Sequence, residues 1–532
     1  MVFTLHRYIF RELFRSFFLA TVVLTLMISV GLLVPTLQDF GVGPGQILHL
    51  LGYFIPIALT FVLPTSALFA SSLIYGRFAA DRELDACRAS GISMWTLIYP
   101  GLTLAIFVAV ANLILSFYIA PAFVHRSERS VKANAEHILF RNIQKKGSYT
   151  LPKSPYRLYA DRAIPEMNLL EGIIIINLPK DRPARLVTTE RAEVRIETHS
   201  TYNRATVTAL NANLFEEDKW VDLSYFEDTQ EFPSLLSDDI KFQKIEQLKL
   251  IQADKMHFFP IREIVMQARA QLAIEMLAHQ IGVHMKQTES HYQFEDESRT
   301  YYLRAAGCQV SSQPETLVLQ APIQLVQVDK HGSGVTVEYT SREGSIMIEN
   351  AGENLRLKMN LKSPSWKRPG VQPGKAVGKF VNNIRFPQSI LSSVSMDHIL
   401  DTVLQTNTEA SILKEKPSPR LESLCIKIPE ELTEVDNDIY SEIHSRLVLG
   451  LGCIALILTG IALGIQFRGG HILSAFGASA IPGGVLVVFI LAGKELTKNP
   501  STPALTGVAV MWAGLVVLLM LTLWIYQKLL RT

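Results

Sequence analysis

The two ends of this 532-residue chain are almost free of charged side chains, whereas its middle has the composition of a soluble protein. Few Lys, Arg, Asp or Glu residues occur between positions 16 and 76 or between positions 447 and 525. A helix that spans a bilayer needs about 18 or more consecutive, mostly apolar residues, and both ends contain such runs. We therefore predict a membrane protein with a large polar insertion.

Six apolar runs are long enough to span a bilayer, three on each side of the insertion. They are residues 17–34, 50–75, a segment within 89–124, 447–467, 472–493 and 503–526. The first run is too long for the apolar core of a secretory signal and lacks a convincing small-residue cleavage site. We therefore expect it to be a retained anchor.

Basic residues in the short loops predict the side that each loop faces. One set of loops holds Arg7, Arg11, Arg15, Arg77, Arg82, Arg88, Arg468, Lys528 and Arg531. The other short loops hold only Lys494 and Lys498. Both termini and the segment 77–93 are therefore expected in the cytoplasm, and the insertion, roughly residues 125–444, on the outer side.

The insertion contains many strand signals. Residues 191–197 alternate apolar and charged side chains, which is typical of a half-buried strand, and residues 171–178 and 220–226 are further candidates. Many short strands separated by turn residues favour an antiparallel β-sandwich or jelly roll.

A helical pattern interrupts these strands and divides the insertion. Residues 261–285 carry apolar side chains at helical spacing, whereas strand patterns return afterwards, most clearly at residues 355–362. We therefore predict two β-rich lobes separated by a helix. Residues 362–421 are rich in Pro, Ser and Lys at both ends, so they are expected to include a mobile linker.

No motif gives the chain a catalytic or metal site of its own. The sequence has no P-loop, no HExxH and no GxSxG. Its 51 basic and 49 acidic residues nearly balance, so no nucleic-acid partner is indicated. We therefore predict no catalytic residue, no metal ligand and no cofactor on this chain.

The four cysteines are too few for a disulfide framework or a paired CxxC zinc site. Cys308 and Cys425 both lie in the insertion. They could form a disulfide if the insertion faces an oxidising compartment, and the alternative is two buried thiols.

The charged stretch RFAADRELDACRASGIS, Arg77–Ser93, lies between two apolar runs of membrane length. Residues 78–90 are predicted to form a helix with an apolar side and a charged side, which Gly91 ends as a C′ residue. Such a helix could dock a partner on the membrane surface, or the stretch could be a polar loop that sets the topology. The residues alone leave both interpretations open.

Two stretches resemble a known family. DRELDACRASGIS after the second span, and IYSEIHSRLVLGLGCIALILTGIALGIQFRGGHILSAFG around the fourth and fifth spans, are similar to the LptF/LptG (YjgP/YjgQ) permeases of the lipopolysaccharide export system. The resemblance covers about the first 230 residues and the last 95. It implies a helical bundle of six transmembrane helices with a periplasmic antiparallel β-jellyroll domain, enlarged here by an insertion.

The resemblance also implies a function and partners. The chain would be the permease subunit of an ABC-type exporter of lipopolysaccharide or a related glycolipid in the bacterial inner membrane. It would pair with a second permease of this type and with two copies of an ATP-binding subunit, which would hold ATP and Mg²⁺. The lipid would pass to the periplasmic β-domain and to a β-jellyroll bridge protein. A homodimer, a heterodimer, and either of the two family roles all fit the sequence.

The family's functional residues can be placed on this sequence. Residues 77–91 would form the cytoplasmic coupling helix that docks on the ATPase. Its expected coupling residues are Glu83, at the family's acidic position, and Leu84, Arg88, Ala89, Ser90 and Gly91. The lipid path or lateral gate is expected at Leu26, Val30 and Leu33 of the first span and Gly483, Val487 and Phe489 of the fifth. Small residues in the fifth span would also suit packing within one chain.

We divide the chain by these signals into residues 1–124 with three spans, 125–254 with the jelly roll, 255–435 with the inserted helix, second lobe and linker, and 436–532 with three more spans. Two features depart from the family. No Lys or Arg occurs between positions 17 and 75 to meet lipid phosphates, and the region 254–429 looks added, with partner docking as its first suggested role. The alternatives to an exporter are a membrane scaffold or sensor and a mechanotransmitting ABC permease.

Overall fold

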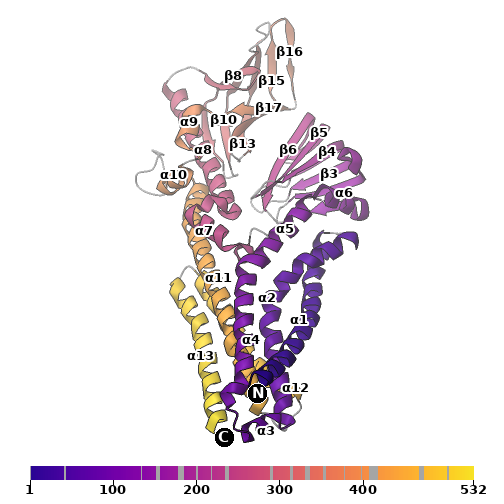
Figure 1. Cartoon of the computed structure of the whole chain (residues 1–532). Coiled ribbons are helices and arrows are strands. Elements are labelled where there is room, and N and C mark those ends of the chain that lie inside the picture. The colour runs from indigo at the N-terminus through magenta and orange to yellow at the C-terminus, as the bar shows by residue number, and fades with distance from the viewer. Residues whose placement is uncertain are drawn as a thin grey trace. The chain divides into compact units, whose positions relative to one another are not determined.

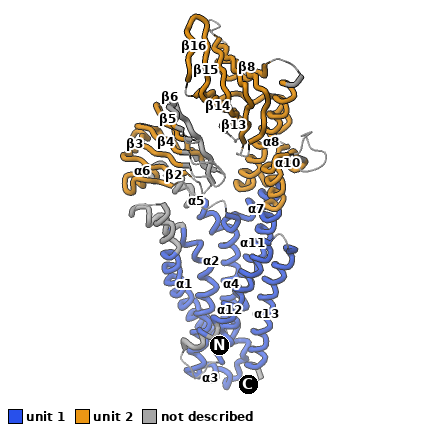
Figure 2. The backbone as a smooth tube through the Cα atoms, turned by 180° about the vertical axis from the view of Figure 1, so that it is seen from behind, with its two compact units in different colours: residues 1–138, 234–254, 433–532 blue, residues 139–233, 255–432 orange. Residues whose placement is uncertain are grey.

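The computed structural model divides the chain into two compact units. Unit 1 contains residues 1–138, 234–254 and 433–532, and unit 2 contains residues 139–233 and 255–432 (Figure 2). The structure describes the chain except residues 1, 41–43, 134, 151–155, 178–184, 199–201, 217–218, 234–238, 288–290, 312–314, 330–335, 351–354, 377, 397, 407–416, 467–471, 500–501 and 532. The segment 234–254, predicted with the first β-domain, thus belongs with the helices of unit 1.

Unit 1 contains the six predicted membrane helices, and this prediction is confirmed (Figure 1). The long helices are α1 (Val2–Phe40), α2 (Pro44–Ala80), α4 (Met94–Ile114), α11 (Pro419–Gln466), α12 (Ile472–Lys498) and α13 (Ala504–Arg531). The part of α11 before residue 433 belongs to unit 2. A π-helical turn, Leu115–Ile119, carries α4 into α5 (Ala120–Ala133). Short helices complete the unit: α3 (Glu83–Ala89), the 3-10 turn η3 (Ile240–Phe242) and α7 (Ile245–Ala253).

Small residues allow the helices of unit 1 to pack closely. Gly464 of α11 lies so near α2 that a Cβ there would be 2.8 Å from the Ser72 carbonyl oxygen. A Cβ on Gly507 of α13 would be 2.3 Å from the carbonyl oxygen of Gly493 on α12. Where lipid surrounds helices, such close approach supplies the packing that the hydrophobic effect cannot.

Helix α11 is longer than the predicted fourth span. It begins at Pro419 rather than near residue 447, because Ser418 caps it: the Leu421 N–H donates to Ser418 Oγ over 3.2 Å. The Glu275 carboxylate also accepts the Ser418 N–H over 3.1 Å. Hydropathy finds the apolar part of a helix, and it misses a charged extension that continues the same backbone.

Unit 2 begins with one six-stranded antiparallel sheet. Its strands follow chain order: β1 (Ser148–Thr150), β2 (Tyr156–Ile164), β3 (Leu169–Asn177), β4 (Arg185–Thr198), β5 (Tyr202–Glu216) and β6 (Lys219–Pro233). The strands predicted at 171–178, 191–197 and 220–226 are thus confirmed. Helix α6 (Ala135–Lys146) packs Leu139, Phe140 and Ile143 on the buried face of this sheet.

The second lobe starts with the predicted helix, α8 (Phe259–Gln287), and continues as two antiparallel sheets. One has the order β17-β14-β13-β10-β9 and the other the order β16-β15-β12-β11-β8-β7. Their strands are β7 (Tyr292–Glu295), β8 (Arg299–Arg304), β9 (Gly307–Val310), β10 (Thr316–Gln320), β11 (Ile323–Asp329), β12 (Val337–Ser341), β13 (Glu343–Asn350), β14 (Arg356–Lys362), β15 (Ser365–Arg368), β16 (Val371–Lys375) and β17 (Gly378–Arg385). The fold class, a membrane helical bundle with antiparallel β-structure, is confirmed.

The region 362–421, predicted to include a mobile linker, consists mostly of regular secondary structure. This region contains β15, β16, β17 and two helices, α9 (Gln388–Ser393) and α10 (Ile399–Thr406). Residues 407–416 lie outside the described part of the chain. The hairpin of β15 and β16 is mostly exposed, so its polar composition resembles that of a linker although its backbone pairs as a sheet.

Candidate functional site

The segment 77–93 connects α2 to α4 and contains the short helix α3 (Figure 1). Helix α2 continues through Arg77 to Ala80, and the chain then turns at Arg82, which has a left-handed φ of 56°. The single helix predicted for residues 78–90 is therefore two pieces, and α3 has only seven residues. A non-glycine residue in the left-handed region is uncommon, so the residue pattern does not predict this break.

Both ends of α3 are fixed by local hydrogen bonds. Gly91 has the positive φ of 82° expected of a residue that stops a helix, and its N–H donates to the Arg88 carbonyl over 2.9 Å. Two residues later, Ser93 caps α4 by accepting the Thr96 N–H over 3.3 Å. The chain therefore passes from α3 to α4 in a short, defined turn.

The predicted coupling residues lie on different sides of α3. Leu84 is 3% exposed and packs in the helical core of unit 1, so it anchors α3 to its own bundle. Glu83, Arg88, Ala89, Ser90 and Gly91 are exposed. The structure thus presents a small surface with an acid, a base and three small residues.

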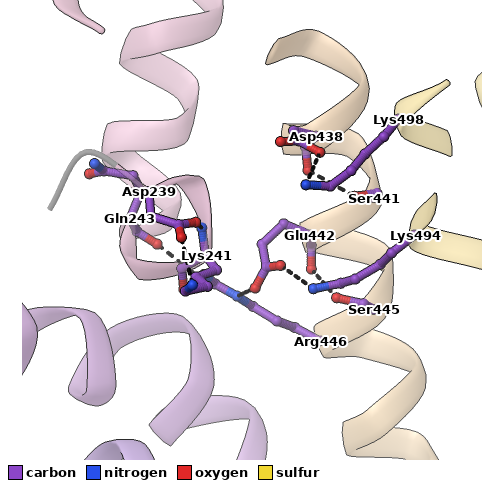
Figure 3. A network of polar contacts seen from close by, with 10 residues as sticks. All are labelled: Asp239, Lys241, Gln243, Asp438, Ser441, Glu442, Ser445, Arg446, Lys494 and Lys498. Atoms are coloured by element: carbon purple, nitrogen blue, oxygen red, sulfur yellow. Dashed lines mark hydrogen bonds and ion pairs between the residues drawn. The ribbon is translucent and has the colours of Figure 1, made fainter. Parts of the chain in front are cut away.

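A second polar site, which the sequence analysis did not predict, joins α11 to α12 (Figure 3). The Glu442 carboxylate accepts from Arg446 Nε over 2.9 Å and from Lys494 Nζ over 2.5 Å. Their side chains are 11%, 5% and 26% exposed, respectively. A buried carboxylate is therefore shared by two cations from neighbouring helices.

Arg446 also reaches two further segments of unit 1. Its guanidinium donates to the carbonyl oxygens of Gln243, over 3.1 Å, and Lys241, over 2.9 Å, at the 3-10 turn η3. The Phe117 ring of the π-helical turn lies 5.5 Å from the same guanidinium carbon. The planar guanidinium suits several partners at fixed angles, so this one side chain ties α11 to η3 and to the π-helical turn.

A second ion pair lies one turn further along both helices. Lys498 Nζ of α12 is 3.2 Å from Asp438 Oδ1 of α11 (Figure 3). The sequence signal for both pairs is spacing by four residues, 438 and 442 on one helix and 494 and 498 on the other, which places each pair of residues on one helix face.

The predicted lipid-path residues divide by exposure. Leu26 and Val30 of α1 and Val487 of α12 are 49%, 52% and 47% exposed, so they face away from the helical core. Gly483 instead faces Leu456, and Phe489 packs against Gly514 of α13. The Leu33 side chain lies outside the described residues.

The two cysteines of the insertion are free thiols in the structure. Cys308 Sγ donates to the Ala278 carbonyl over 3.1 Å, and Cys425 Sγ donates to the Val403 carbonyl over 3.3 Å. Within the described chain, no group of three or more His, Cys, Asp or Glu residues is placed to hold a metal ion.

Comparison with known proteins identifies the family. The family model described as "Lipopolysaccharide export system permease LptF/LptG" matches residues 7–297 and 329–528. This match includes most of the region 254–429 that we had predicted to be an addition, so that region is largely part of the family's own architecture. A comparison with curated proteins gave no match. Because the family model covers most of the sequence, from the first membrane helix to the last, the chain belongs to the LptF/LptG family of lipopolysaccharide export permeases.

Proposed function

We propose that this chain is one of two paired permeases in an ABC-type exporter of lipopolysaccharide or a related glycolipid, and that a separate ATPase powers it. Family membership makes the chain a transporter permease rather than an enzyme. In the proposed complex, two ATP-binding subunits hold ATP and Mg²⁺. The permease pair takes lipid from the inner membrane and passes it through the periplasmic β-structure to a β-jellyroll bridge protein.

The observation that carries the proposal is the placement of α3. Leu84 holds one side of this helix in the bundle, while Glu83 and Arg88 remain exposed on the other. Helix α3 is joined by short turns to two long helices, α2 and α4, on either side. Because packed interiors transmit displacement, a subunit that moves α3 would move the ends of both long helices.

The charge pattern supports docking of the ATPase on this side of the membrane. Arg77, Arg82 and Arg88 all lie in or next to α3, and short loops rich in Lys and Arg face the cytoplasm. ATP is available in that compartment. Glu83 would then pair with a basic residue of the ATPase, and Ala89, Ser90 and Gly91 would allow close backbone contact.

Co-purification tests this proposal. The chain is expressed with the ATP-binding subunit of its export system, extracted in mild detergent and purified through a tag on the permease. We expect the ATPase to co-purify with the wild type and to be lost from Glu83→Arg, because the new guanidinium would face a basic docking residue. The matched control is Glu190→Arg, which reverses an exposed carboxylate on β4 of unit 2 and should keep the ATPase.

Two results would contradict the proposal. Retention of the ATPase by Glu83→Arg at the wild-type level would remove α3 as the docking element. Failure of the wild type to retain any ATPase in several mild detergents would favour a scaffold. A photo-crosslinker at Val487, which is 47% exposed, separately tests transport. An exporter should label the exported glycolipid there in preference to bilayer phospholipid, and a mechanotransmitting permease should label only phospholipid.

A further inference from the structure

The core of the second lobe opens at one edge into a row of aromatic side chains. Register places Leu303, Leu325, Tyr339 and Trp366 opposite one another on successive strands β8, β11, β12 and β15, so they share one sheet face. Leu303 and Leu325 are fully buried, whereas Tyr339 and Trp366 are only partly buried. The inner face of this sheet therefore changes from closed core to an accessible aromatic surface.

Trp366 is held flat by the hairpin that carries it. Its cross-strand partner is Gly374 of β16, where a Cβ would lie 2.7 Å from three atoms of the indole. The ring therefore lies directly against the β16 backbone. Because any side chain at position 374 would displace it, the glycine supports an indole platform that is in place before any ligand binds.

The opposite sheet contributes a cation to this surface. Lys379 of β17 pairs with Leu361 of β14, so both residues point to the same side of their sheet. That side faces the first sheet, because a Cβ on Gly344 would lie 2.8 Å from Leu361 and 3.1 Å from Ile323 of β11. Lys379 Nζ lies 5.0 Å from the centre of the Tyr339 ring. The two sheets thus meet at a lysine over a phenol.

Two arginines lie on the same sheet face as Tyr339. Arg299 is four residues from Leu303 on β8, and its Nε is 2.9 Å from Asp329 Oδ1. Arg368 is two residues beyond Trp366 on β15 and is exposed. Burial lowers the pKa of Lys379, and the nearby Arg299 lowers it further. Burial raises the pKa of Tyr339, and Arg299 and Arg368 oppose this rise.

Positive charge exceeds negative charge at this place. Among the described side chains, Arg299, Arg368 and Lys379 lie near the phenol, and two carboxylates, Asp329 and Asp296, contact Arg299. The neighbouring Asp296 already accepts hydrogen bonds from the Ser298 and Arg299 N–H groups and from the Tyr301 hydroxyl. Lysine in a partly buried site that holds other cations gains from an incoming anion.

The combination of groups selects a chemical class of ligand. Arginine and lysine bind phosphate and carboxylate through charge-assisted hydrogen bonds, and the arginine fork can bind them bidentately. The indole and phenol supply large apolar faces with polar edges, on which the C–H face of a sugar ring can lie. A simple apolar chain would contact the two rings but would make no charge-assisted hydrogen bond with the three cations.

We propose that Tyr339, Trp366, Arg299, Arg368 and Lys379 form a binding site for a sugar that carries phosphate or carboxylate. The site deepens the proposed export function and rests on it in one respect, since the sugar would then belong to the transported glycolipid. A free sugar phosphate has the same chemistry. The site would also provide basic groups outside the first two membrane spans, which have none between positions 17 and 75.

Binding to the full-length permease in lipid nanodiscs, without ATPase, tests the site. The probes are a purified phosphorylated lipopolysaccharide, the same lipid after enzymatic removal of phosphate, and glucose 6-phosphate. We expect Arg368→Gln and Lys379→Gln each to weaken binding of the phosphorylated probe roughly tenfold, the value of one charge-assisted hydrogen bond. The matched control is Lys375→Gln, an exposed lysine next to Gly374 whose side chain points to the opposite sheet face.

The outcomes separate the source of the ligand from the existence of the site. Tight binding of lipopolysaccharide alone assigns the site to cargo, and equal binding of glucose 6-phosphate assigns it to soluble sugar phosphates. Equal affinities of Arg368→Gln and Lys375→Gln, or equal binding of the dephosphorylated lipid, would overturn the proposal. Arg368 is exposed, so this variant should fold even if Lys379→Gln does not. Since no ATPase is present, failure here is distinct from failure of the export proposal.

Discussion

Replacement of Glu442 by leucine should be among the most destabilising single changes in unit 1. The change leaves Arg446, 5% exposed, and Lys494, 26% exposed, without their shared carboxylate. At an effective dielectric constant near 20, one such contact at about 4 Å contributes roughly 4 kcal/mol of Coulomb energy, which desolvation offsets. Removal of one partner from a buried pair costs about 3–5 kcal/mol because the remaining charge stays buried.

A double-mutant cycle separates the cost of a stranded charge from the cost of lost packing. Arg446→Met alone should cost about 1–3 kcal/mol, since it removes the donor to the Gln243 and Lys241 carbonyls while Glu442 keeps Lys494. Glu442→Leu combined with Arg446→Met should cost less than Glu442→Leu alone, because no cation then remains fully buried. The two changes should therefore couple by about 2 kcal/mol.

Unfolding in mixed micelles by increasing SDS, followed by tryptophan fluorescence, measures these free energies. Trp512 is a local reporter, since its Nε1 lies 3.3 Å from His444 Nδ1 on the same stretch of α11. The control is Lys427→Met, which breaks an exposed pair with Glu431 on the same helix and should cost about 0–1 kcal/mol. Additive costs of the two single changes within about 0.5 kcal/mol would refute the shared buried carboxylate as the source of the stability.

Three further changes probe other parts of the fold. Gly507→Ala should destabilise the protein by about 1–3 kcal/mol, since its Cβ would lie 2.1 Å from Thr497 Oγ1. SDS unfolding measures this change, and an unchanged free energy of unfolding would disprove the close packing of α12 and α13. Tyr75→Phe should cost about 0.5–1.5 kcal/mol by removing the hydrogen bond of 2.8 Å to the Leu97 carbonyl, and the same titration should show no loss if that bond is absent. Burial alone would raise the pKa of Asp296, but hydrogen bonds from Tyr301, Ser298 and Arg299 lower it below 3.8. The stability that the ionised Asp296 carboxylate provides is therefore present above the unfolded-state pKa and is lost as pH falls through the folded-state pKa. Asp296→Asn should therefore lower the thermal unfolding temperature at neutral pH, and its difference in unfolding temperature from the wild type should shrink below pH 3.8. A difference that is constant at all pH values would contradict this role.

Local patterns in the sequence were sufficient to locate most elements. The six spans, the strands at 171–178 and 191–197 and the helix at 261–285 each depend on the length or the periodicity of apolar residues within a single segment, and all are present in the structure. This information is contained in each segment itself, so no knowledge of its partners is needed.

The remaining features depend on contacts between distant segments. Glu442 and Lys494 are 52 positions apart, and the spacing by four residues on each helix does not show which helices face one another. Lys379 and Tyr339 belong to different sheets, and only the packing of those sheets places one over the other. The short length of α3 depends on the left-handed backbone at Arg82, which an arginine does not predict.

The ion pairs of Figure 3 also fix the position of α12 along α11. After Arg446, α11 continues for about 20 residues without a charged side chain, and before Lys494, α12 has about 22 such residues. At 1.5 Å per residue these runs are roughly 30 and 33 Å long, close to the thickness of a bilayer core. The contact of Lys494 with Glu442 places the charged ends of both runs at one level, where a charge costs less than at mid-membrane. A slide of α12 by one helical turn, about 5.4 Å, would separate Lys494 from Glu442 and Lys498 from Asp438, which are now 2.5 Å and 3.2 Å apart. Because the charged residues are spaced by one turn on each helix, only one new pair could form in place of the two. The fifth span therefore cannot shift along the fourth without breaking both pairs, and any movement that leaves them intact must be a rotation or tilt.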